Sequence, residues 1–196
     1  YPRISNLDQF QPLKNIPGFR LQWVRSPADL VGLKRIDWII LPGSKHTSGD
    51  LAWLRAQGLD TAIAQHAQQG GAVLGICGGL QMLGEALIDP HGIDGNAPGL
   101  GLLPLVTVFE TNKIVRHTQA CFSDALAACT ASTFAPLAGV TVAGYEIHNG
   151  QTQQHADMAQ AGIVAHAALP DGLGWYNAQG NVLGVYVHGL FEDAAA

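Results

Sequence analysis

The sequence predicts an α/β fold that contains a parallel sheet, and three observations indicate it. Short runs rich in Val, Ile and Leu alternate with stretches whose apolar residues recur at helical spacing. The run 72–76 is apolar throughout, as in a strand that a parallel sheet buries on both faces. From residue 102 onward short strand candidates follow one another, so strands dominate the second half of the chain.

The first half of the chain alternates predicted strands and helices. Segments 20–24 and 37–41 are predicted strands, and Pro-Gly ends the second. Segment 50–69 carries apolar residues at helical spacing and predicts one amphipathic helix, which Gly-Gly terminates. Strand 72–76, a helix over 79–87 and a loop over 90–98 follow.

The second half is predicted to be mostly strand. The candidates are 105–109, 114–119, 140–148, 163–167 and 182–188, the last of them preceded by turn residues. No internal repeat or linker-like change in composition interrupts the chain. We therefore expect one domain over residues 1–196.

The composition is that of a globular domain. Of the 196 residues, 47% are hydrophobic and 13% charged, whereas disordered chains combine low hydrophobicity with high charge. The net charge of −5 argues against a nucleic-acid partner, because phosphate binding needs an excess of Lys and Arg. No apolar run approaches the roughly 20 residues of a membrane span, and the start is not a signal peptide. Because the chain begins without Met, we expect a piece of a longer protein.

The cysteines and histidines predict neither a disulfide framework nor a metal site. Cys77, Cys121 and Cys129 form no Cys-x-x-Cys pair, which favours the reducing cytoplasm. No two of the eight histidines have the i, i+4 spacing of a helical zinc site. We expect no metal in this chain.

The most informative stretch places Cys77 between strand 72–76 and the helix that follows. It reads Gly-Ile-Cys-Gly-Gly, the thiol form of a nucleophile elbow, whose sharp turn leaves no room for neighbouring Cβ atoms. We predict that Cys77 is a nucleophile, that the helix dipole favours its thiolate, and that Gly78 donates its N–H to an oxyanion. The alternative is an inert buried cysteine.

Two histidines compete for the role of base. His188 closes strand 182–188, and the carboxyl ends of strands are where functional groups of doubly wound sheets collect. His148 closes strand 140–148, and Glu146 beside it could orient an imidazole or bind a substrate ammonium group. We choose His188 to take the thiol proton and return it to the leaving group. The residues alone do not rank it above His148, and packing is the alternative role of either one.

A glycine-bearing loop, LPGSKHTSG, follows strand 37–41. It lacks the phosphate-loop pattern G-x-x-x-x-G-K-[ST], which occurs nowhere else in the chain, so we expect no ATP site of its own. We expect Gly43 or Ser44 to direct a second backbone N–H toward the elbow, as an equivalent loop does in α/β hydrolases.

The chain resembles the class I (triad-type) glutamine amidotransferase domains in four ordered motifs: LPGSKHT, GICGGLQMLG, GYEIHNG and VYVHGLFED. Within that family it is most similar to the C-terminal glutaminase domains of cobyric acid synthases, whose opening residues 1–6 match. The resemblance implies a flavodoxin-like α/β fold, with a mostly parallel central sheet flanked by helices and with additional antiparallel strands. It also implies hydrolysis of glutamine to glutamate and ammonia.

The resemblance further implies the roles of single residues. Cys77 forms a γ-glutamyl thioester, His188 is its partner, Gly43 and Gly78 form the oxyanion hole, and Gln81 contacts the substrate glutamine. Most class I glutaminases carry Glu two residues after the His, but position 190 is Leu here. This departure leaves Glu192, Glu146 or a backbone carbonyl to hold the His188 tautomer.

The resemblance implies partners outside this chain. An N-terminal synthetase domain, absent here, would use ATP and Mg to amidate the corrinoid adenosylcobyrinic acid a,c-diamide to cobyric acid. The alternatives are a glutaminase domain of the cobyrinic acid a,c-diamide synthase or lipid II amidotransferase type, another cysteine hydrolase or redox sensor with an elbow, and a non-catalytic interaction module.

Overall fold

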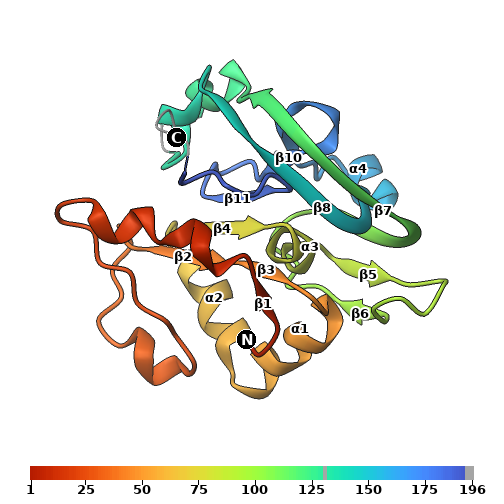
Figure 1. Ribbon diagram of the computed structural model, residues 1–196, viewed down its shortest axis with the longest axis horizontal. Helices are drawn as coiled ribbons and strands as arrows, with labels where there is room; N and C mark the ends of the chain where they lie inside the picture. The colour runs from red at the N-terminus through yellow and green to blue at the C-terminus, as the bar shows by residue number, and fades with distance from the viewer. Residues whose placement is uncertain (130–131, 193–196) are drawn as a thin grey trace.

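The computed structural model describes residues 1–129 and 132–192, which form three sheets with helices packed around them (Figure 1). The largest sheet has the order β2-β4-β11-β10-β9, and its strands are β2 Trp38–Leu41, β4 Ala72–Ile76, β11 Val182–Val185, β10 Gly174–Tyr176 and β9 His166–Leu169. β2, β4 and β11 run parallel, whereas β10 and β9 are antiparallel to their neighbours. The predicted α/β class, with additional antiparallel strands, is confirmed.

The helices are shorter than predicted because glycines interrupt them. The predicted helix 50–69 is two helices, α1 Thr47–Ala56 and α2 Leu59–Gln68, since Gly58 adopts the left-handed conformation with φ 72°. The predicted helix 79–87 is α3 Gly78–Leu83, and Gly84 turns extended to end it. A fourth helix, α4, spans Ala156–Gln160. Short 3-10 helices span Leu7–Phe10, Pro12–Asn15, Pro27–Leu30, Asp124–Ala128, Ala135–Leu137 and Pro170–Gly172.

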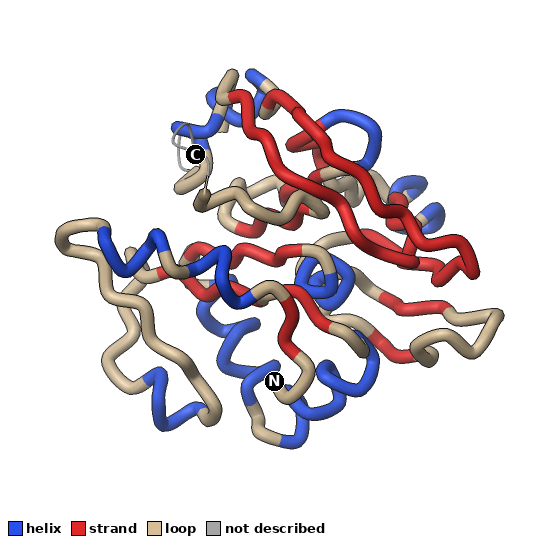
Figure 2. Tube along the Cα trace, in the orientation of Figure 1, coloured by secondary structure: helices blue, strands red, loops and turns tan. Residues whose placement is uncertain are grey.

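The second sheet consists mainly of two long antiparallel strands and lies beside the large sheet (Figures 1 and 2). It has the order β6-β5-β7-β8, with β6 Ala97–Pro98, β5 Ala86–Ile88, β7 Leu105–Cys121 and β8 Thr141–Gln154. The predicted strands 105–109 and 114–119 are one strand, whose pairing is irregular between Phe109 and Ile114. The third sheet pairs β1 Ile4–Ser5 with β3 Gly43–Ser44.

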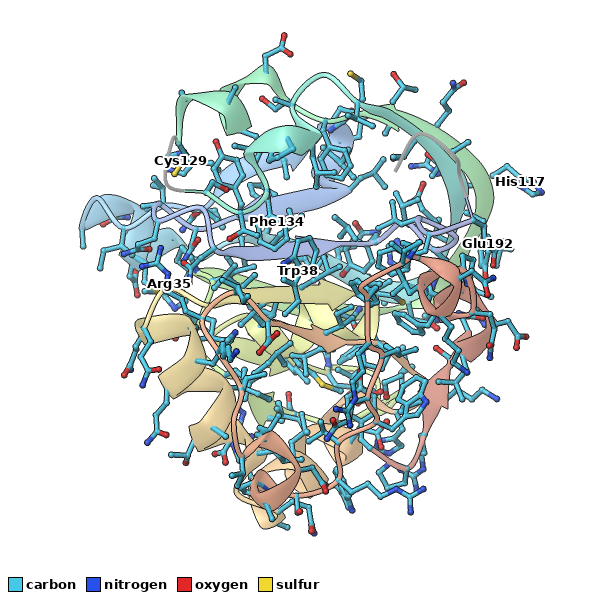
Figure 3. The ribbon with its side chains drawn as sticks, turned by 90° about the vertical axis from the view of Figure 1, so that its left-hand side faces the viewer. Arg35, Trp38, His117, Cys129, Phe134 and Glu192 are labelled. Carbon is cyan, nitrogen blue, oxygen red and sulfur yellow. The ribbon has the colours of Figure 1, made fainter. Side chains whose placement is uncertain are left out.

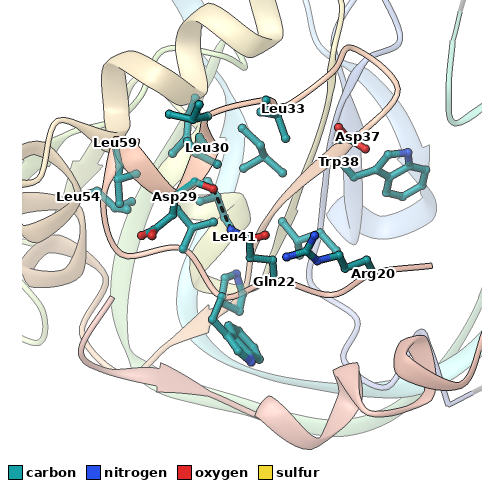
Figure 4. Close-up of a pocket in the computed structure, with 18 of the residues that line it drawn as sticks. Arg20, Gln22, Asp29, Leu30, Leu33, Asp37, Trp38, Leu41, Leu54 and Leu59 are labelled. Carbon is teal, nitrogen blue, oxygen red and sulfur yellow. Dashed lines mark hydrogen bonds between the residues drawn. The ribbon is translucent and has the colours of Figure 1, made fainter. Parts of the chain in front are cut away.

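Segment 20–24 forms no strand, contrary to the prediction. Together with β2 it lines a cavity of about 760 Å³ (Figure 4). The side chain of Gln22 instead donates to the carbonyl of Asp29 at 2.8 Å. Other cavity walls are apolar and come from α1 and α2, through Leu54 and Leu59.

The core follows the parallel strands. Every residue of β4 and β11 is buried, as the apolar run 72–76 predicts, and α1 and α2 lie on one side of these strands (Figure 1). At the edge strand, the ring of Trp38 packs edge-on against Phe134, with centroids 5.0 Å apart (Figure 3). Trp38 nevertheless stays exposed, and burial along β2 increases toward Leu41 at its carboxyl end.

Candidate active site

Three parallel strands end side by side, and the predicted catalytic residues follow their ends. β3, which holds Gly43 and Ser44, comes just after β2, Cys77 comes directly after β4, and His188 comes three residues after β11. β4 pairs with β2 on one side and with β11 on the other. The fold therefore brings the predicted nucleophile, the predicted base and the loop that holds Gly43 and Ser44 (the oxyanion loop) to one edge of the sheet, where α/β proteins place their sites.

The backbone at Cys77 has the strained turn expected of an elbow. Its φ of 53° and ψ of −107° are disfavoured for a residue with a Cβ atom. The flanking glycines are required by packing: a Cβ at Gly75 would lie 2.6 Å from the backbone of Gly79, and one at Gly79 would overlap the Leu41 carbonyl oxygen. The strand–turn–helix geometry predicted from the sequence is the geometry of the structure.

Burial disfavours the charged form of the Cys77 thiol. Its residue is 6% exposed, and Sγ donates to the carbonyl oxygen of Ile147 at 3.5 Å. Burial raises the pKa of the thiol to about 12, although the N–H of Gly78 and the charge of Lys113 act to lower it. The prediction of a favoured thiolate is therefore wrong for this conformation, because the dipole of the six-residue α3 does not offset the loss of water.

The oxyanion loop contributes Ser44 more directly than Gly43. The backbone N–H of Lys45 donates to the carbonyl of Arg3, so alternation along the ladder turns the N–H of Gly43 toward β1 and that of Ser44 away from it. A Cβ on Gly78 would lie 2.8 Å from the backbone nitrogen of Ser44. The two backbone N–H groups that flank the elbow are thus those of Gly78 and Ser44.

His188 is fully buried, at 0% exposed, and is held from several sides. Its ring stacks on Tyr145 with centroids 5.2 Å apart, and the two residues exchange backbone hydrogen bonds of 2.9 and 3.2 Å. The side-chain nitrogen of Asn6 lies 3.3 Å from Nδ1 and 3.4 Å from Nε2. Burial, aided by the nearby His148, lowers the pKa of the imidazole to about 4, so at neutral pH it is an unprotonated base.

Glu146 and His148 form a charged cluster with Arg116, on β7 and β8. Arg116 Nε donates to one Glu146 oxygen at 2.6 Å, and the other oxygen lies 3.5 Å from His148 Nε2. His148 Nδ1 lies 2.7 Å from the carbonyl of Gly150, and its ring stacks on Tyr186 at 3.8 Å. Burial lowers the pKa of His148 against the effect of these acceptors. The predicted role of Glu146 and His148 in substrate binding stays a prediction.

Gln81 lies in a buried network and is 2% exposed. Its side-chain oxygen accepts from Thr47 Oγ1 at 3.1 Å, and its nitrogen donates to the hydroxyl of Tyr186 at 3.2 Å. That hydroxyl also meets Thr152 Oγ1 at 2.5 Å. Among the residues that the structure describes, the amide keeps one free N–H and one free acceptor position, and the substrate contact that the resemblance implies for Gln81 stays a prediction.

Neither carboxylate proposed to orient His188 bonds to it within the described part of the chain. Glu146 is engaged by Arg116 and His148. Glu192 is exposed and, with Tyr145 and His117, borders an open depression of about 760 Å³ (Figure 3). Sequence reasoning missed Asn6, because nothing in its local pattern relates it to a histidine near the other end of the chain.

The structure offers no direct hydrogen bond between the thiol and either imidazole within residues 1–129 and 132–192. Neither of the two cavities described above is lined by Cys77 or His188. In the same ranges no group of three or more His, Cys, Asp and Glu side chains is arranged to hold a metal ion. None of the helices found there is long and apolar enough to cross a membrane.

Comparisons with known proteins place these observations in a family. The chain matches the CobB/CobQ-like glutamine amidotransferase domain over residues 1–196. It is 71% identical over 196 residues to a cobyric acid synthase of Variovorax paradoxus and to one of Albidiferax ferrireducens, covering all of this chain and 39% of each relative. The chain thus spans about two fifths of the length of these curated relatives.

Solved structures share the fold. A crystal structure of a glutamine amidotransferase superposes with a TM-score of 0.66 at 17% identity, covering 97% of this chain and 89% of that one. A chain in the structure of PurLQS from Thermotoga maritima gives a TM-score of 0.62 at 19% identity, covering 96% and 84%. From the match over its whole length, the chain belongs to the family of CobB/CobQ-like glutamine amidotransferase domains.

Proposed function

We propose that this chain releases ammonia from the side-chain amide of glutamine through a thioester on Cys77. The observation that carries the proposal is the convergence of an elbow cysteine, a buried neutral histidine and two backbone N–H groups on three adjacent strand ends. A thiol, a base and a pair of oxyanion donors are the groups that acyl transfer from an amide requires.

The reaction follows from these groups. Sγ of Cys77 attacks the amide carbon while His188 takes the thiol proton. The N–H groups of Gly78 and Ser44 hold the resulting oxyanion. His188 then gives its proton to the leaving nitrogen, and ammonia departs from a γ-glutamyl thioester. A water molecule, deprotonated by the same histidine, attacks the thioester, and glutamate leaves as the thiol is restored.

Before it can attack, the thiol of Cys77 must break its hydrogen bond to the carbonyl of Ile147. The gap between a pKa of about 12 at Cys77 and about 4 at His188 makes proton transfer cost on the order of 10 kcal/mol, before the two new charges attract each other. For attack, the Cys77 side chain turns away from the carbonyl of Ile147 when substrate binds. Substrate binding must therefore lower the cost of ionising the thiol.

The likeness to cobyric acid synthases supports a wider role. We propose that the ammonia is consumed by an ATP- and Mg-dependent synthetase domain that amidates adenosylcobyrinic acid a,c-diamide, in cobalamin biosynthesis in the cytoplasm. The phosphate-loop pattern does not occur in the sequence, and we assign the amidation to a separate domain as part of this proposal.

The test is glutamine hydrolysis by matched cysteine variants. Cys77→Ala is expected to lose at least about 10⁴-fold in kcat, as removal of a nucleophile does in related acyl transfer, because no other group can form the thioester. Cys129→Ala, the same change at a partly exposed cysteine outside the site, is expected to keep the activity. Glutamate release by Cys77→Ala at the wild-type rate would reject the proposal.

A further inference from the structure

The imidazole of His188 has no carboxylate partner among the described residues, yet its ring is fixed. Tyr145 covers it at a centroid distance of 5.2 Å, and a Cβ on Gly43 would lie 3.0 Å from its Cε1 atom. Among the described residues, the side chain within hydrogen-bonding distance of the ring nitrogens is the amide of Asn6, whose nitrogen is nearly equidistant from them at 3.3 and 3.4 Å. Because the amide nitrogen lies equally close to both, this contact fixes the position of the ring and does not select a tautomer.

Asn6 is itself anchored on both sides. Before it, β1 pairs with the oxyanion loop, Ile4 opposite Ser44 and Ser5 opposite Gly43. After it, the side-chain oxygen of Gln9 accepts the N–H of Gly189, the residue next to His188, at 3.3 Å. The segment that carries Asn6 therefore contacts both the oxyanion loop and the residue that follows His188. Figure 1 shows β1 running beside β3.

The backbone of Asn6 is suited to this position. It has φ 55° and ψ 45°, a left-handed conformation that asparagine adopts more readily than other residues with a side chain. This turn lies between β1 and the 3-10 helix Leu7–Phe10, so the amide is presented at a sharp bend. A bend held in this way fixes the direction of the side chain that leaves it.

We propose that Asn6 is a positioning residue that holds the ring of His188 in its orientation, in place of the carboxylate that most class I glutaminases carry two residues after the histidine. A neutral amide adds no charge beside the imidazole, so it does not favour the protonated form. The lowered pKa of His188 agrees with a neutral partner, because a carboxylate would raise it. The inference rests on the proposed function, in which His188 is the base.

Asn6→Gly is the decisive variant, because glycine adopts the left-handed conformation freely and only the amide is lost. We expect kcat for glutamine hydrolysis to fall about 100-fold or more, with KM within about threefold of wild type, since the amide acts on the base and not on substrate binding. The thermal unfolding midpoint should stay close to that of wild type. Asn15→Gly, the same change at an exposed residue of the same segment, should leave kcat unchanged.

Asn6→Asp separates positioning from a general structural role. A carboxylate of the same shape should restore much of the rate lost in Asn6→Gly, and it should move the acid limb of kcat/KM to higher pH by about one unit or more. An unchanged kcat in Asn6→Gly, or an acid limb that does not move in Asn6→Asp, would overturn the inference. Wild-type protein that fails to hydrolyse glutamine would instead refute the proposed function, so the two failures are distinguishable.

Discussion

Two polar clusters contact β8, and their electrostatics differ. Around Cys77 and His188 the partners are neutral, namely the carbonyl of Ile147 and the amide of Asn6, and burial favours the uncharged form of both reacting groups. Around His148 the partners are the charged side chains of Glu146 and Arg116. Ile147 itself connects the two, since it lies between Glu146 and His148 in the chain.

The difference indicates which histidine does chemistry. A base must begin unprotonated and must be free to gain a proton, which suits the neutral surroundings of His188. Both ring nitrogens of His148 already face acceptors, the carbonyl of Gly150 and the carboxylate of Glu146, so it has no free position from which to take a thiol proton. We therefore assign proton transfer to His188 and a supporting role to the His148 cluster.

The same substitution at both histidines tests which of them transfers the proton. His188→Asn is expected to lower kcat for glutamine hydrolysis about 10³-fold or more, because the thiol then lacks a base. His148→Asn is expected to change kcat less than about tenfold. Steady-state kinetics on both variants checks the assignment, and a larger loss in kcat at His148 would exchange the two roles.

The neutral form of buried His188 should also make the free energy of unfolding depend on pH. The ordinary pKa of histidine is 6.5 and that of folded His188 is about 4, so between these values the unfolded chain binds a proton that the folded chain does not. Stability must then fall as the pH is lowered. From pH 7.5 to pH 5 the His188 contribution to the free energy of unfolding should decrease by about 2 kcal/mol.

Urea unfolding of wild type and His188→Asn at the two pH values isolates this contribution from those of other groups. Wild type should lose about 2 kcal/mol more than the variant on going to pH 5. Equal losses in the two proteins would mean that His188 is not held in a neutral form.

A smaller effect tests the strain at the elbow. At the φ of 53° of Cys77, glycine is unstrained and alanine is not, so Cys77→Gly should be more stable to unfolding than Cys77→Ala by about 1 kcal/mol. At the exposed Cys121 in β7 the order should reverse, because an ordinary strand disfavours glycine. Urea unfolding of the four variants gives both differences, and the same order at the two sites would argue against a strained elbow.

The sequence predicts features that depend on local pattern. Strand 72–76 is correct to the residue, because an apolar run buried on both faces is bounded by a glycine pair and by the elbow. The break at Gly58 is missed, since the helical pattern continues across it. The placing of strand ends side by side follows from the parallel topology and needs no side-chain detail.

The features that the sequence does not predict depend on contacts between residues far apart in the chain. The partner of His188 is an amide from the first residues of the chain, and the partner of Cys77 is a carbonyl of β8. Burial raises the pKa of the thiol, and part of that burial comes from β8, whose Ile147 carbonyl the thiol contacts. Neither contact leaves a local pattern.

During turnover, the sulfur of Cys77 is proposed to become covalently bound to the γ-carbonyl of glutamine. Mass spectrometry of protein quenched in acid while it hydrolyses glutamine detects this adduct, and peptide mapping locates it. We expect one glutamyl group on Cys77 and none on Cys121 or Cys129. Active protein that carries no such adduct, or carries it on another residue, would refute a thioester on Cys77.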